Sequence, residues 1–379
     1  MRIERVDCKN YRNMDIFSLE PCAGVNVIYG ENAVGKTNVI ESMWLCTGEK
    51  SFRGNADGEL IRFGCDKAAV RCKFYAAGRE QECELTLQNG KRDASLNRIA
   101  LKAPSELTGQ FYGVIFSPNH LALVQDGPGE RRKFIDSAIC QIKPGYGRVL
   151  ANYKRALDQR GKLLKDIPFQ TQLLQTLDIW DEHLALLGGH IAAGRVRYIR
   201  RLAPRAKEIY DGISAGRETL SISYLSQTFD PDCEAPAAQT AIFREKLLAA
   251  RTQDIEMGHT GQGVHRDDLD IRIDGAPARA FGSQGQKRSC VLALKLGEAH
   301  LLRDTVEETP VVFLDDVMSE LDEGRQRYLL GHLDGWQLFI TSSVVLSPYR
   351  GEPLEEREKQ EVKVFHFLSG PDGLVAEEN

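Results

Sequence analysis

The sequence predicts an α/β fold, a mixed sheet with flanking helices that is interrupted by an inserted helical arm. A β-prone run at residues 24–29 is followed at once by a glycine-containing loop and a helix, and a fully apolar run at 310–314 ends in two aspartates. Short apolar runs suit parallel strands that are buried on both faces. Lys36 and Ser283, which both belong to the predicted sheet domain, are 247 positions apart (283 − 36). Since consecutive elements of a compact sheet usually have short connections, a sizeable segment is inserted between them.

The loop after the first of these strands is the most informative segment of the chain. It is a complete G-x-x-x-x-G-K-[ST] phosphate loop made of Gly30, Glu31, Asn32, Ala33, Val34, Gly35, Lys36 and Thr37. Gly30 and Gly35 let backbone N–H groups turn inward, where a Cβ would obstruct phosphates, and the following helix adds its partial positive charge. We expect Lys36 to reach the β- and γ-phosphates of a nucleoside triphosphate and the Thr37 hydroxyl to ligate Mg²⁺. The alternative is a glycine-rich turn that carries a lysine by chance.

The apolar run at 310–314 supplies the partner of a phosphate loop, a strand that ends in an acid near the Mg²⁺. Asp315 stands at the carboxyl end of this strand, where open α/β sheets bind their ligands. We expect it to hold the metal directly or through water. Asp316 follows at once, and we expect it to orient or deprotonate the attacking water. The alternative is a strand followed by an aspartate that only caps a helix.

Composition bounds the class of protein. At 379 residues, the chain has room for two domains or for one α/β domain with a large insertion. No run approaches about 18 apolar residues, and the first residues lack the apolar core of a signal peptide, so we expect no membrane association and a cytoplasmic location. Nine cysteines without a C-x-x-C pair argue against zinc and disulfides, and we expect free, mostly buried thiols. The net charge of −5 means that any nucleic-acid surface is a local patch.

A second glycine-containing helix start precedes the aspartate strand. Its residues are Ser283, Gln284 and Gly285, followed by a strongly helical stretch at 291–299. A small polar helix start is an anion site, although taken alone this segment is an ordinary cap. The order of phosphate loop, Ser-Gln-Gly-Gln and aspartate strand is that of the ABC-type ATPases, whose Ser-Gly-Gly-Gln signature completes the nucleotide site of a partner. We therefore expect the chain to dimerise with nucleotide shared between subunits.

The inserted arm, residues 129–214, is predicted to be helical. Pro144-Gly145 and Pro168 mark breaks between its helices, and Gly188-Gly189 and Pro204 are weak points within the last one. We expect an antiparallel helical hairpin, since the segment is too short and interrupted for a long coiled coil. At the other end of the protein, the residues from about 369 onward are expected to form a loose tail.

The arm concentrates positive charge. Residues 143–165 contain seven Lys or Arg and one acid, and residues 195–207 contain six and no acid. Because phosphate contacts supply most sequence-independent DNA affinity, we expect this arm to grip double-stranded DNA, with Arg197, Arg200 and Arg201 as the contacts. The alternative is a solvated helix face, which is the usual explanation of a charge run.

Several longer segments together are more specific than any single motif. They are Lys9-Asn10-Tyr11-Arg12-Asn13, Ser51-Phe52-Arg53, Phe116-Ser117-Pro118, Gly263-Val264-His265-Arg266-Asp267-Asp268-Leu269, Phe281-Gly282-Ser283-Gln284-Gly285-Gln286 and Ser319-Glu320-Leu321-Asp322. With these segments the chain resembles, over nearly its whole length, the RecF family of bacterial recombination-mediator ATPases, which is related to the SMC-type heads. It departs from the family at Val264, where proline is usual, and at Asn119-His120, where an acidic pair is usual.

The resemblance implies a function. It implies ATP and Mg²⁺ as cofactors, an ATP-dependent homodimer, slow and DNA-stimulated hydrolysis, and ATP-dependent binding of double-stranded DNA near the nucleoid. It also implies action with RecR and RecO to help load RecA at gaps and stalled forks during DNA repair, recombination, replication and the SOS response. Arg12 is expected to contact the nucleotide. Transporter ATPases usually carry a histidine after the strand that follows the aspartates, and here Thr341 is the candidate for sensing the γ-phosphate.

We expect three parts in the chain: residues 1–128 and 215–379 as the two parts of the ATPase head, and 129–214 as the basic arm. Two other classes of protein stay open at this point. One is the nucleotide-binding subunit of an ABC transporter, against which the long basic insertion argues. The other is a scaffold in which ATP clamps two heads together without turnover, against which Asp316 argues.

Overall fold

The two strands that the sequence predicts lie in one sheet, on either side of a third strand. In the computed structural model, which describes residues 1–344, 361–370 and 373–378, β3 (Val25–Gly30) and β12 (Val311–Asp315) both pair in parallel with β13 (Leu338–Ser342). All five residues of β12 and of β13 are buried, which explains their apolar sequence. The α/β fold class is therefore confirmed, and the carboxyl ends of three strands meet at one edge.

Contacts divide the chain into two compact units. Unit 1 comprises Met1–His120 and Lys295–Asn379, and unit 2 comprises Leu121–Leu294. These bounds differ from the three parts that we expect from the sequence, because the segment from 215 to 294 clusters with the helical insertion. Its strand β9 (Leu220–Leu225) and helix α6 (Pro236–Met257) both pack against a long helix of the insertion. Assignment of the parts by function stays a prediction.

Unit 1 contains a second, antiparallel sheet. Its strands, in spatial order, are β2 (Met14–Leu19), β1 (Arg2–Tyr11), β4 (Lys67–Ala76), β5 (Arg79–Gln88), β6 (Lys91–Leu96) and β7 (Ile99–Ala100). Eight of the ten residues of α1 (Lys36–Leu45) are buried, and its apolar residues share one core with residues of both sheets. A short helix that is buried nearly all round lies inside the core, so α1 is fixed by both sheets.

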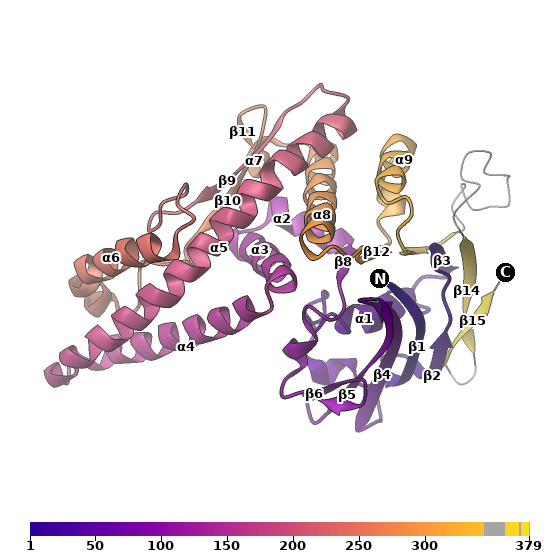
Figure 1. Ribbon diagram of the computed structural model, residues 1–379, viewed down its shortest axis with the longest axis horizontal. Helices are drawn as coiled ribbons and strands as arrows, with labels where there is room; N and C mark the ends of the chain where they lie inside the picture. The colour runs from indigo at the N-terminus through magenta and orange to yellow at the C-terminus, as the bar shows by residue number, and fades with distance from the viewer. Residues whose placement is uncertain (345–360, 371–372, 379) are drawn as a thin grey trace. The chain divides into compact units, whose positions relative to one another are not determined.

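Residues 362–370 and 373–378 belong to the sheet of unit 1 that contains β3, so the expectation of a loose tail from about residue 369 is wrong for the described part of this segment. β14 (Val362–Gly370) pairs in parallel with β3, and β15 (Gly373–Glu378) pairs antiparallel with β14. Phe367 and Leu374 bury their side chains in the core, which explains why the segment is ordered. β8 (Gly113–Phe116) extends the other side of the sheet, and α9 (Glu323–His332) follows β12 (Figure 1).

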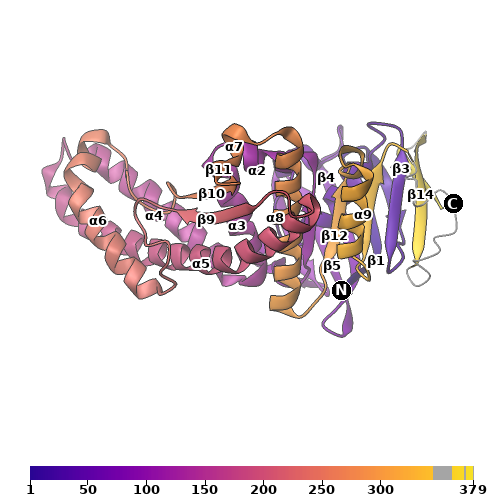
Figure 2. The same cartoon turned by 90° about the horizontal axis from the view of Figure 1, so that it is seen from above.

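Unit 2 is mainly helical. Its elements besides β9 and α6 are α2 (Ala122–Gln125), α3 (Pro128–Ile142), α4 (Gly145–Asp166), α5 (Leu174–Ser214), β10 (Asp268–Ile273), β11 (Ala276–Pro277), α7 (Ala278–Phe281) and the start of α8 (Gln284–Val306). Figures 1 and 2 show α4, α5 and α6 running alongside one another, and α5 packs against both of the other helices. The breaks predicted at Pro144-Gly145 and Pro168 are confirmed, and the expected hairpin of α4 and α5 carries α6 as a third helix.

α5 is continuous over 41 residues, so the predicted weak points at Gly188-Gly189 and Pro204 do not interrupt it. The two glycines serve the packing of α5 on α6. A Cβ at Gly188 would lie 2.6 Å from the ring of Phe243, and one at Gly189 would lie 2.3 Å from the hydroxyl of Thr240. The sequence pattern signals flexibility, but the close approach of α6 requires residues without a side chain here.

A fully buried arginine ties these three helices together. Arg160 of α4 donates to Asp181 of α5 at 2.7 Å, to Asp254 of α6 at 2.6 Å and to Thr260 at 2.9 Å, and its side chain is 0% exposed. Breaking a buried pair by removal of one partner typically costs about 3–5 kcal/mol, because the remaining charge is left without a partner. One of the arm's basic residues is therefore internal.

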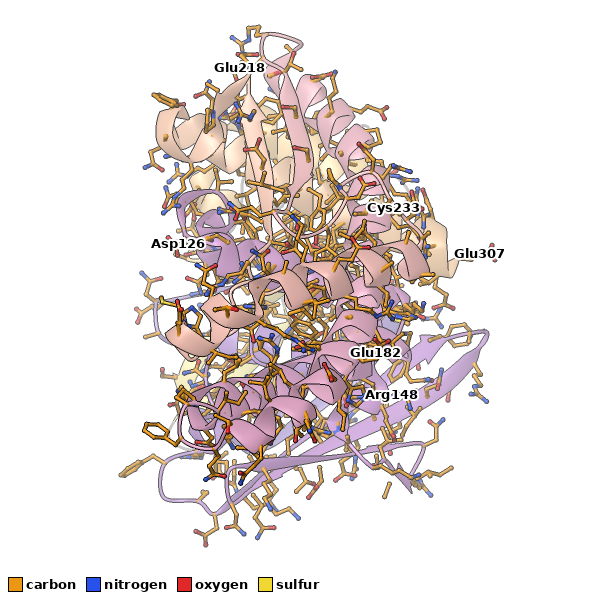
Figure 3. All side chains as sticks on the ribbon, turned by 90° about the vertical axis from the view of Figure 1, so that its left-hand side faces the viewer. Asp126, Arg148, Glu182, Glu218, Cys233 and Glu307 are labelled. Atoms are coloured by element: carbon orange, nitrogen blue, oxygen red, sulfur yellow. The ribbon has the colours of Figure 1, made fainter. Side chains whose placement is uncertain are left out.

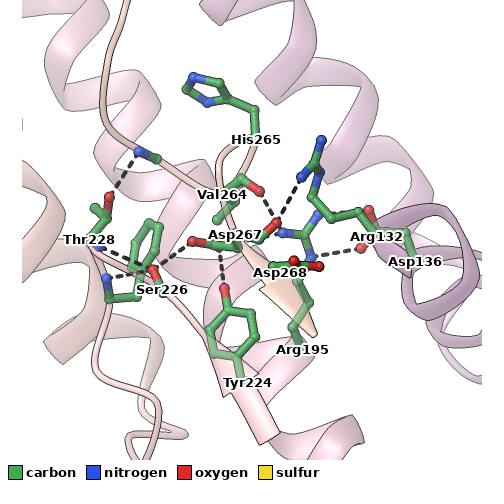
Figure 4. Close-up of polar contacts among 12 residues, drawn as sticks. Arg132, Asp136, Arg195, Tyr224, Ser226, Thr228, Val264, His265, Asp267 and Asp268 are labelled. Atoms are coloured by element: carbon green, nitrogen blue, oxygen red, sulfur yellow. Dashed lines mark hydrogen bonds and ion pairs between the residues drawn. The ribbon is translucent and has the colours of Figure 1, made fainter. Parts of the chain in front are cut away.

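A second polar network holds the segment around His265 (Figure 4). Arg195 of α5 forms two hydrogen bonds with Asp136, at 2.9 and 2.8 Å, and donates to the Val264 carbonyl at 2.7 Å. The carboxylate of Asp267 accepts from Tyr224 and Ser226. This loop between α6 and β10 is therefore anchored to α3, α5 and β9 by polar contacts.

All nine cysteines are free, and six are buried, as the sequence predicts. Within the residues described here, the helices are each too short or too polar to cross a lipid bilayer.

Protonation of His265 is expected to destabilise unit 2 in mild acid. The imidazole lies between the Tyr153 hydroxyl at 2.9 Å and the Thr260 carbonyl at 3.1 Å, and burial, with Arg266 and Arg132 nearby, lowers its pKa to about 4. An unfolded histidine titrates near pH 6.5, so the unfolded state takes up the proton first. Stability is therefore full above about pH 6.5 and falls by on the order of 3 kcal/mol toward pH 4.

Denaturant unfolding of the wild type and of His265→Gln across this pH range measures the effect. The variant has no titrating imidazole, so its stability should fall less steeply over the same range. Parallel pH profiles of the two proteins would contradict the assignment.

Candidate functional site

The phosphate loop connects β3 to the N-terminus of α1, as the strand–loop–helix pattern predicts. The Lys36 ammonium donates to the backbone carbonyls of Gly30 at 2.7 Å and Glu31 at 2.8 Å, so it lies in the concavity of the loop. Burial lowers the pKa of Lys36, while the charges of Asp316 and Asp315 act in the opposite direction. A partly desolvated ammonium beside a helix N-terminus is suited to phosphate oxygens.

The two glycines of the loop are each required by a close contact. A Cβ at Gly30 would lie 2.4 Å from the Phe367 carbonyl oxygen of β14. Gly35 has φ 124°, and a Cβ there would lie 2.8 Å from the amide group of Asn13. Asn13 donates to the Val34 carbonyl at 2.6 Å, so this residue of the β1–β2 turn fastens the loop from the side.

Sequence reasoning missed the role of Asn13. Its amide oxygen also accepts from Asn38 of α1 at 2.8 Å, so the side chain connects the loop to the helix that follows it. The only signal in the sequence was its presence in the Lys9–Asn13 segment, which we used for the family resemblance alone. Its partners are distant in sequence and are known only from the fold.

Thr37 and Asp315 meet at the carboxyl edge of the sheet. The Thr37 hydroxyl donates to Asp315 Oδ1 at 2.9 Å, although the two residues are 278 positions apart. Asp315 Oδ1 also accepts from the Thr341 hydroxyl at 2.9 Å. A hydroxyl and a carboxylate oxygen are hard ligands of the kind that Mg²⁺ prefers, and phosphates and water complete such sites in ATPases. The two residues that we predict as metal ligands therefore fit this role.

Thr341 holds the pair of aspartates. Its hydroxyl donates its hydrogen to Asp315 and accepts the backbone N–H of Asp316 at 2.9 Å. In this arrangement it contacts the acids, and its role as a sensor of the γ-phosphate stays a prediction. Burial raises the pKa of Asp315, and the bonds from Thr341 and Thr37 oppose this rise. A bound divalent cation would stabilise the ionised carboxylate further.

Asp316 is placed differently from Asp315. It is exposed, has φ 54°, and accepts a hydrogen bond from the Ser319 hydroxyl at 3.2 Å. Left-handed backbone is uncommon for residues other than glycine, although aspartate and asparagine adopt it more readily than most. The turn directs the chain away from the strand and leaves the exposed Asp316 next to Asp315.

Arg12 lies in a network within the protein. It forms two hydrogen bonds with Glu41 of α1, each 2.9 Å long, and donates to Asn55 at 2.8 Å. Glu41 is 0% exposed and also accepts from Tyr11 and Ser51. The network ties the end of β1 to α1 and to the loop after it. Contact between Arg12 and the nucleotide stays a prediction.

Arg53, in the loop that Glu41 holds through Ser51, is a further cation at this site. Its guanidinium is exposed and donates to Asn38 Oδ1 at 3.0 Å. Its positive charge is among the influences that oppose the raised pKa of Asp315. The sequence shows Arg53 only as part of the Ser51–Arg53 segment, and its proximity to Asp315 depends on the fold.

Within unit 2, Ser283, Gln284 and Gly285 form the start of α8. The Gln286 N–H donates to the Ser283 hydroxyl at 3.2 Å, and the Ser283 N–H donates to the Gln286 side chain at 2.7 Å. This reciprocal pair is a capping box. Ser283 is exposed at the end of the helix, and Gln284 accepts from Gln125 at 3.1 Å. The local conformation is that of an ordinary cap, and it also presents the helix N-terminus to solvent.

Two of the three arginines that we predict to bind DNA already have an acidic partner. Arg200 contacts Glu234 at 2.8 Å and Arg197 contacts it at 3.2 Å, and their side chains are 53% and 51% exposed. Arg201 is exposed, whereas Arg195 of the same run is buried against Asp136. The high charge of this segment is therefore partly compensated, and DNA contact by Arg197, Arg200 and Arg201 stays a prediction.

Comparison with known proteins agrees with this geometry. The RecF/RecN/SMC N terminal domain family matches residues 2–344. The "DNA replication and repair protein RecF" of Agathobacter rectalis is 36% identical over 378 residues, covering 100% of both chains. The protein of the same name from Clostridioides difficile is 39% identical over 345 residues, covering 91% of this chain and 92% of that relative.

Solved structures show the same likeness. The chain is similar to the recombination mediator protein RecF of the RecFOR pathway solved with ATP, with a TM-score of 0.88, 33% identity, and coverage of 100% of this chain and 97% of that one. It is also similar to an Smc head bound to the C-winged helix domain of ScpA, with a TM-score of 0.58 and 13% identity over 100% of this chain and 98% of that one. The second likeness shows the fold alone.

Thr341→Val is expected to weaken the metal site while preserving the fold. The substitution removes the bond to Asp315 and leaves the Asp316 N–H without its acceptor, a loss of roughly 1–3 kcal/mol. The pKa of Asp315 should rise, so the Mg²⁺ dependence of ATP affinity should shift to higher metal concentration. Thr47→Val is the matched control, because the buried Thr47 hydroxyl likewise donates one hydrogen bond, to the Trp44 carbonyl, and accepts one, from the Glu49 N–H, without contacting either acid. Identical Mg²⁺ dependence in both variants would exclude this role.

Proposed function

This chain belongs to the RecF family of the RecF/RecN/SMC group and has the ABC-type ATPase head fold, and on that premise we propose that it is an ATP-driven DNA-binding protein. It binds ATP with Mg²⁺, dimerises around two nucleotides and hydrolyses them slowly, with stimulation by DNA. It grips double-stranded DNA in the ATP-bound state. With RecR- and RecO-type mediators it helps to load RecA at gaps and stalled forks, in the cytoplasm near the nucleoid.

The observation that carries the proposal is the contact of Thr37 with Asp315 beside the Lys36 cradle. A phosphate loop alone is compatible with many nucleotide-binding folds. A hydroxyl at its end and a buried carboxylate from a distant strand, joined at 2.9 Å, form the two protein contributions to a Mg²⁺–nucleotide site. The solved RecF structure with ATP supports the choice of nucleotide.

Asp316 supports turnover rather than a purely structural use of ATP. It is exposed beside Asp315, and the bond from Ser319 orients its carboxylate. A carboxylate in this place polarises a water molecule for attack on the γ-phosphate. The scaffold alternative needs no such group, and it is distinguished from our proposal by measured hydrolysis.

The exposed cap of α8 supports the dimer. Ser283 and Gln284 are exposed, so the positive end of the α8 helix dipole lies at the surface. Under a two-fold axis, such a surface on each subunit meets the nucleotide of the other, so that both sites are completed together. Nucleotide that binds between the subunits then stabilises the dimer by mass action. In this proposal residues 1–128 and 215–379 form the ATPase head, and residues 129–214 form the DNA-binding arm.

Asp316→Asn is expected to separate binding from turnover. The substitution keeps the size and the hydrogen-bonding capacity of the side chain and removes its charge, so ATP should bind and persist while hydrolysis falls by about 10²–10⁴-fold. Asp334→Asn, a change at another exposed aspartate of unit 1, is the control and should hydrolyse ATP at the wild-type rate. Wild-type ATPase activity in Asp316→Asn would exclude Asp316 as the group that activates water.

Two substitutions of Ser283, to aspartate and to asparagine, test the shared site, because these two side chains are nearly isosteric with each other and differ in charge. Aspartate and asparagine both cap helices, so the stability of α8 should be preserved in Ser283→Asp and in Ser283→Asn. Only the aspartate places a negative charge where the phosphates of the partner's nucleotide should lie. In size-exclusion chromatography with ATP, Ser283→Asp should remain monomeric while Ser283→Asn retains dimer. ATP-dependent dimers of equal amount in both variants would contradict the model.

A further inference from the structure

α4 carries a line of cations on one exposed face. Arg148, Arg155 and Lys162 are all exposed and stand seven residues apart, which places them on the same side of the helix. At about 1.5 Å per residue, the line is about 21 Å long. Among the residues that the structure describes, these three side chains form no ion pair or hydrogen bond. They are therefore available to an external anion.

Three exposed arginines on the neighbouring helices of unit 2 differ in this respect. On α5, Arg197 and Arg200 contact Glu234. On α6, Arg244 forms two bonds of 2.6 Å with Glu182. A guanidinium that is already paired with an acid binds a phosphate more weakly, because the phosphate must displace the acid or approach its negative charge. Sequence density of Lys and Arg does not reveal this difference, since it depends on which acids lie across the interhelical spaces.

A groove lies beside the α4 line, between α4 and α5, with a cavity volume of about 600 Å³. On the α4 side, Arg155 and Lys162 line it together with the amides of Asn152 and Gln159, and Asp158 is the one acid among the residues lining it. Trp180 and His183 line it from α5. Figure 3 views this side of unit 2 and labels Arg148 on α4 and Glu182 on α5. Asn152 and Gln159 alternate with the cations at helical spacing, so donors of hydrogen bonds occupy the same face.

We propose that this face of α4 binds the phosphate backbone of duplex DNA. The inference rests on the proposed function and names the surface on which the arm would hold DNA. The exposed face of α4 offers guanidinium, ammonium and amide donors, the composition of a backbone-positioning surface, and the aromatic rings of Trp180 and His183 belong to the α5 side of the groove. At about 3.4 Å per base pair, the line of cations spans roughly six base pairs, enough for several phosphates.

The triple variant Arg148→Ala, Arg155→Ala, Lys162→Ala tests the proposal. Alanine favours the helix, so the fold should be retained. Fluorescence anisotropy with a duplex of about 30 base pairs, in ATP and across about 50–200 mM salt, should show binding weakened by roughly tenfold or more. The slope of log affinity against log salt should fall by about two to three, one unit per lost phosphate contact. ATP-dependent dimerisation should be unchanged.

The matched control is Arg197→Ala, Arg200→Ala, Arg244→Ala, which removes the same number of exposed positive charges from unit 2. It should reduce affinity and salt slope less than the α4 variant does. A larger loss in this control, or an unchanged slope in the α4 variant, would overturn the α4 assignment while leaving the proposed function in place.

Two further outcomes separate the inference from the proposed function. If the wild type binds ATP and dimerises but does not bind duplex DNA at any salt concentration in the series, the proposed function fails and the α4 surface fails with it. If the α4 variant binds DNA normally but loses binding to polyglutamate, the surface recognises acidic protein and the inference is wrong.

Discussion

The register of the parallel sheet is the constraint on which the nucleotide site depends. β13 pairs with β3 so that Thr341 lies opposite Ile28, and it pairs with β12 so that Asp315 lies opposite Thr341. This register places the Asp315 carboxylate at the end of the phosphate loop, within reach of Thr37. Because successive side chains of a strand point to opposite faces, a slip of one residue would turn the Asp315 carboxylate away from Thr37. The same pairing buries three apolar strands, so packing and site geometry are specified together.

Several polar side chains then hold this edge in shape through contacts within the protein. Thr341 binds both acids, Asn13 fastens the loop through Val34, and the buried Glu41 joins β1 to α1 and to the loop that carries Arg53. Each of these bonds is modest alone. A site that must direct charge at a transferring phosphoryl group depends on such preorganisation, because groups that are already oriented need not rearrange during the reaction.

Unit 2 shows how an acidic protein distributes positive charge. Arg160 and Arg195 are buried and hold helices together, whereas Arg197 and Arg200 lie at the surface with acidic partners. Arg148, Arg155 and Lys162, on the exposed face of α4, have no such partners among the described residues. A net charge of −5 therefore does not describe any one surface. The strength of an electrostatic surface is set by the local arrangement of both signs of charge.

The sequence alone determined the fold class, the phosphate loop and the aspartate strand, because these depend on short patterns whose physics is local. Glycine is needed where a Cβ would collide, as at Gly30 and Gly35, and an apolar run signals a strand buried on both faces. Family membership was also readable, because it rests on many such segments in order.

The tertiary structure decided the rest. The continuity of α5 through Gly188, the ordered end of the chain at Leu374 and the role of Asn13 all depend on contacts with distant segments. Contacts with distant segments also decide which arginines are buried, which are paired with acids and which are available to a ligand. The local sequence indicates which conformation a segment prefers. Packing partners that are distant in the sequence decide whether a glycine is flexible and whether a charge has a partner.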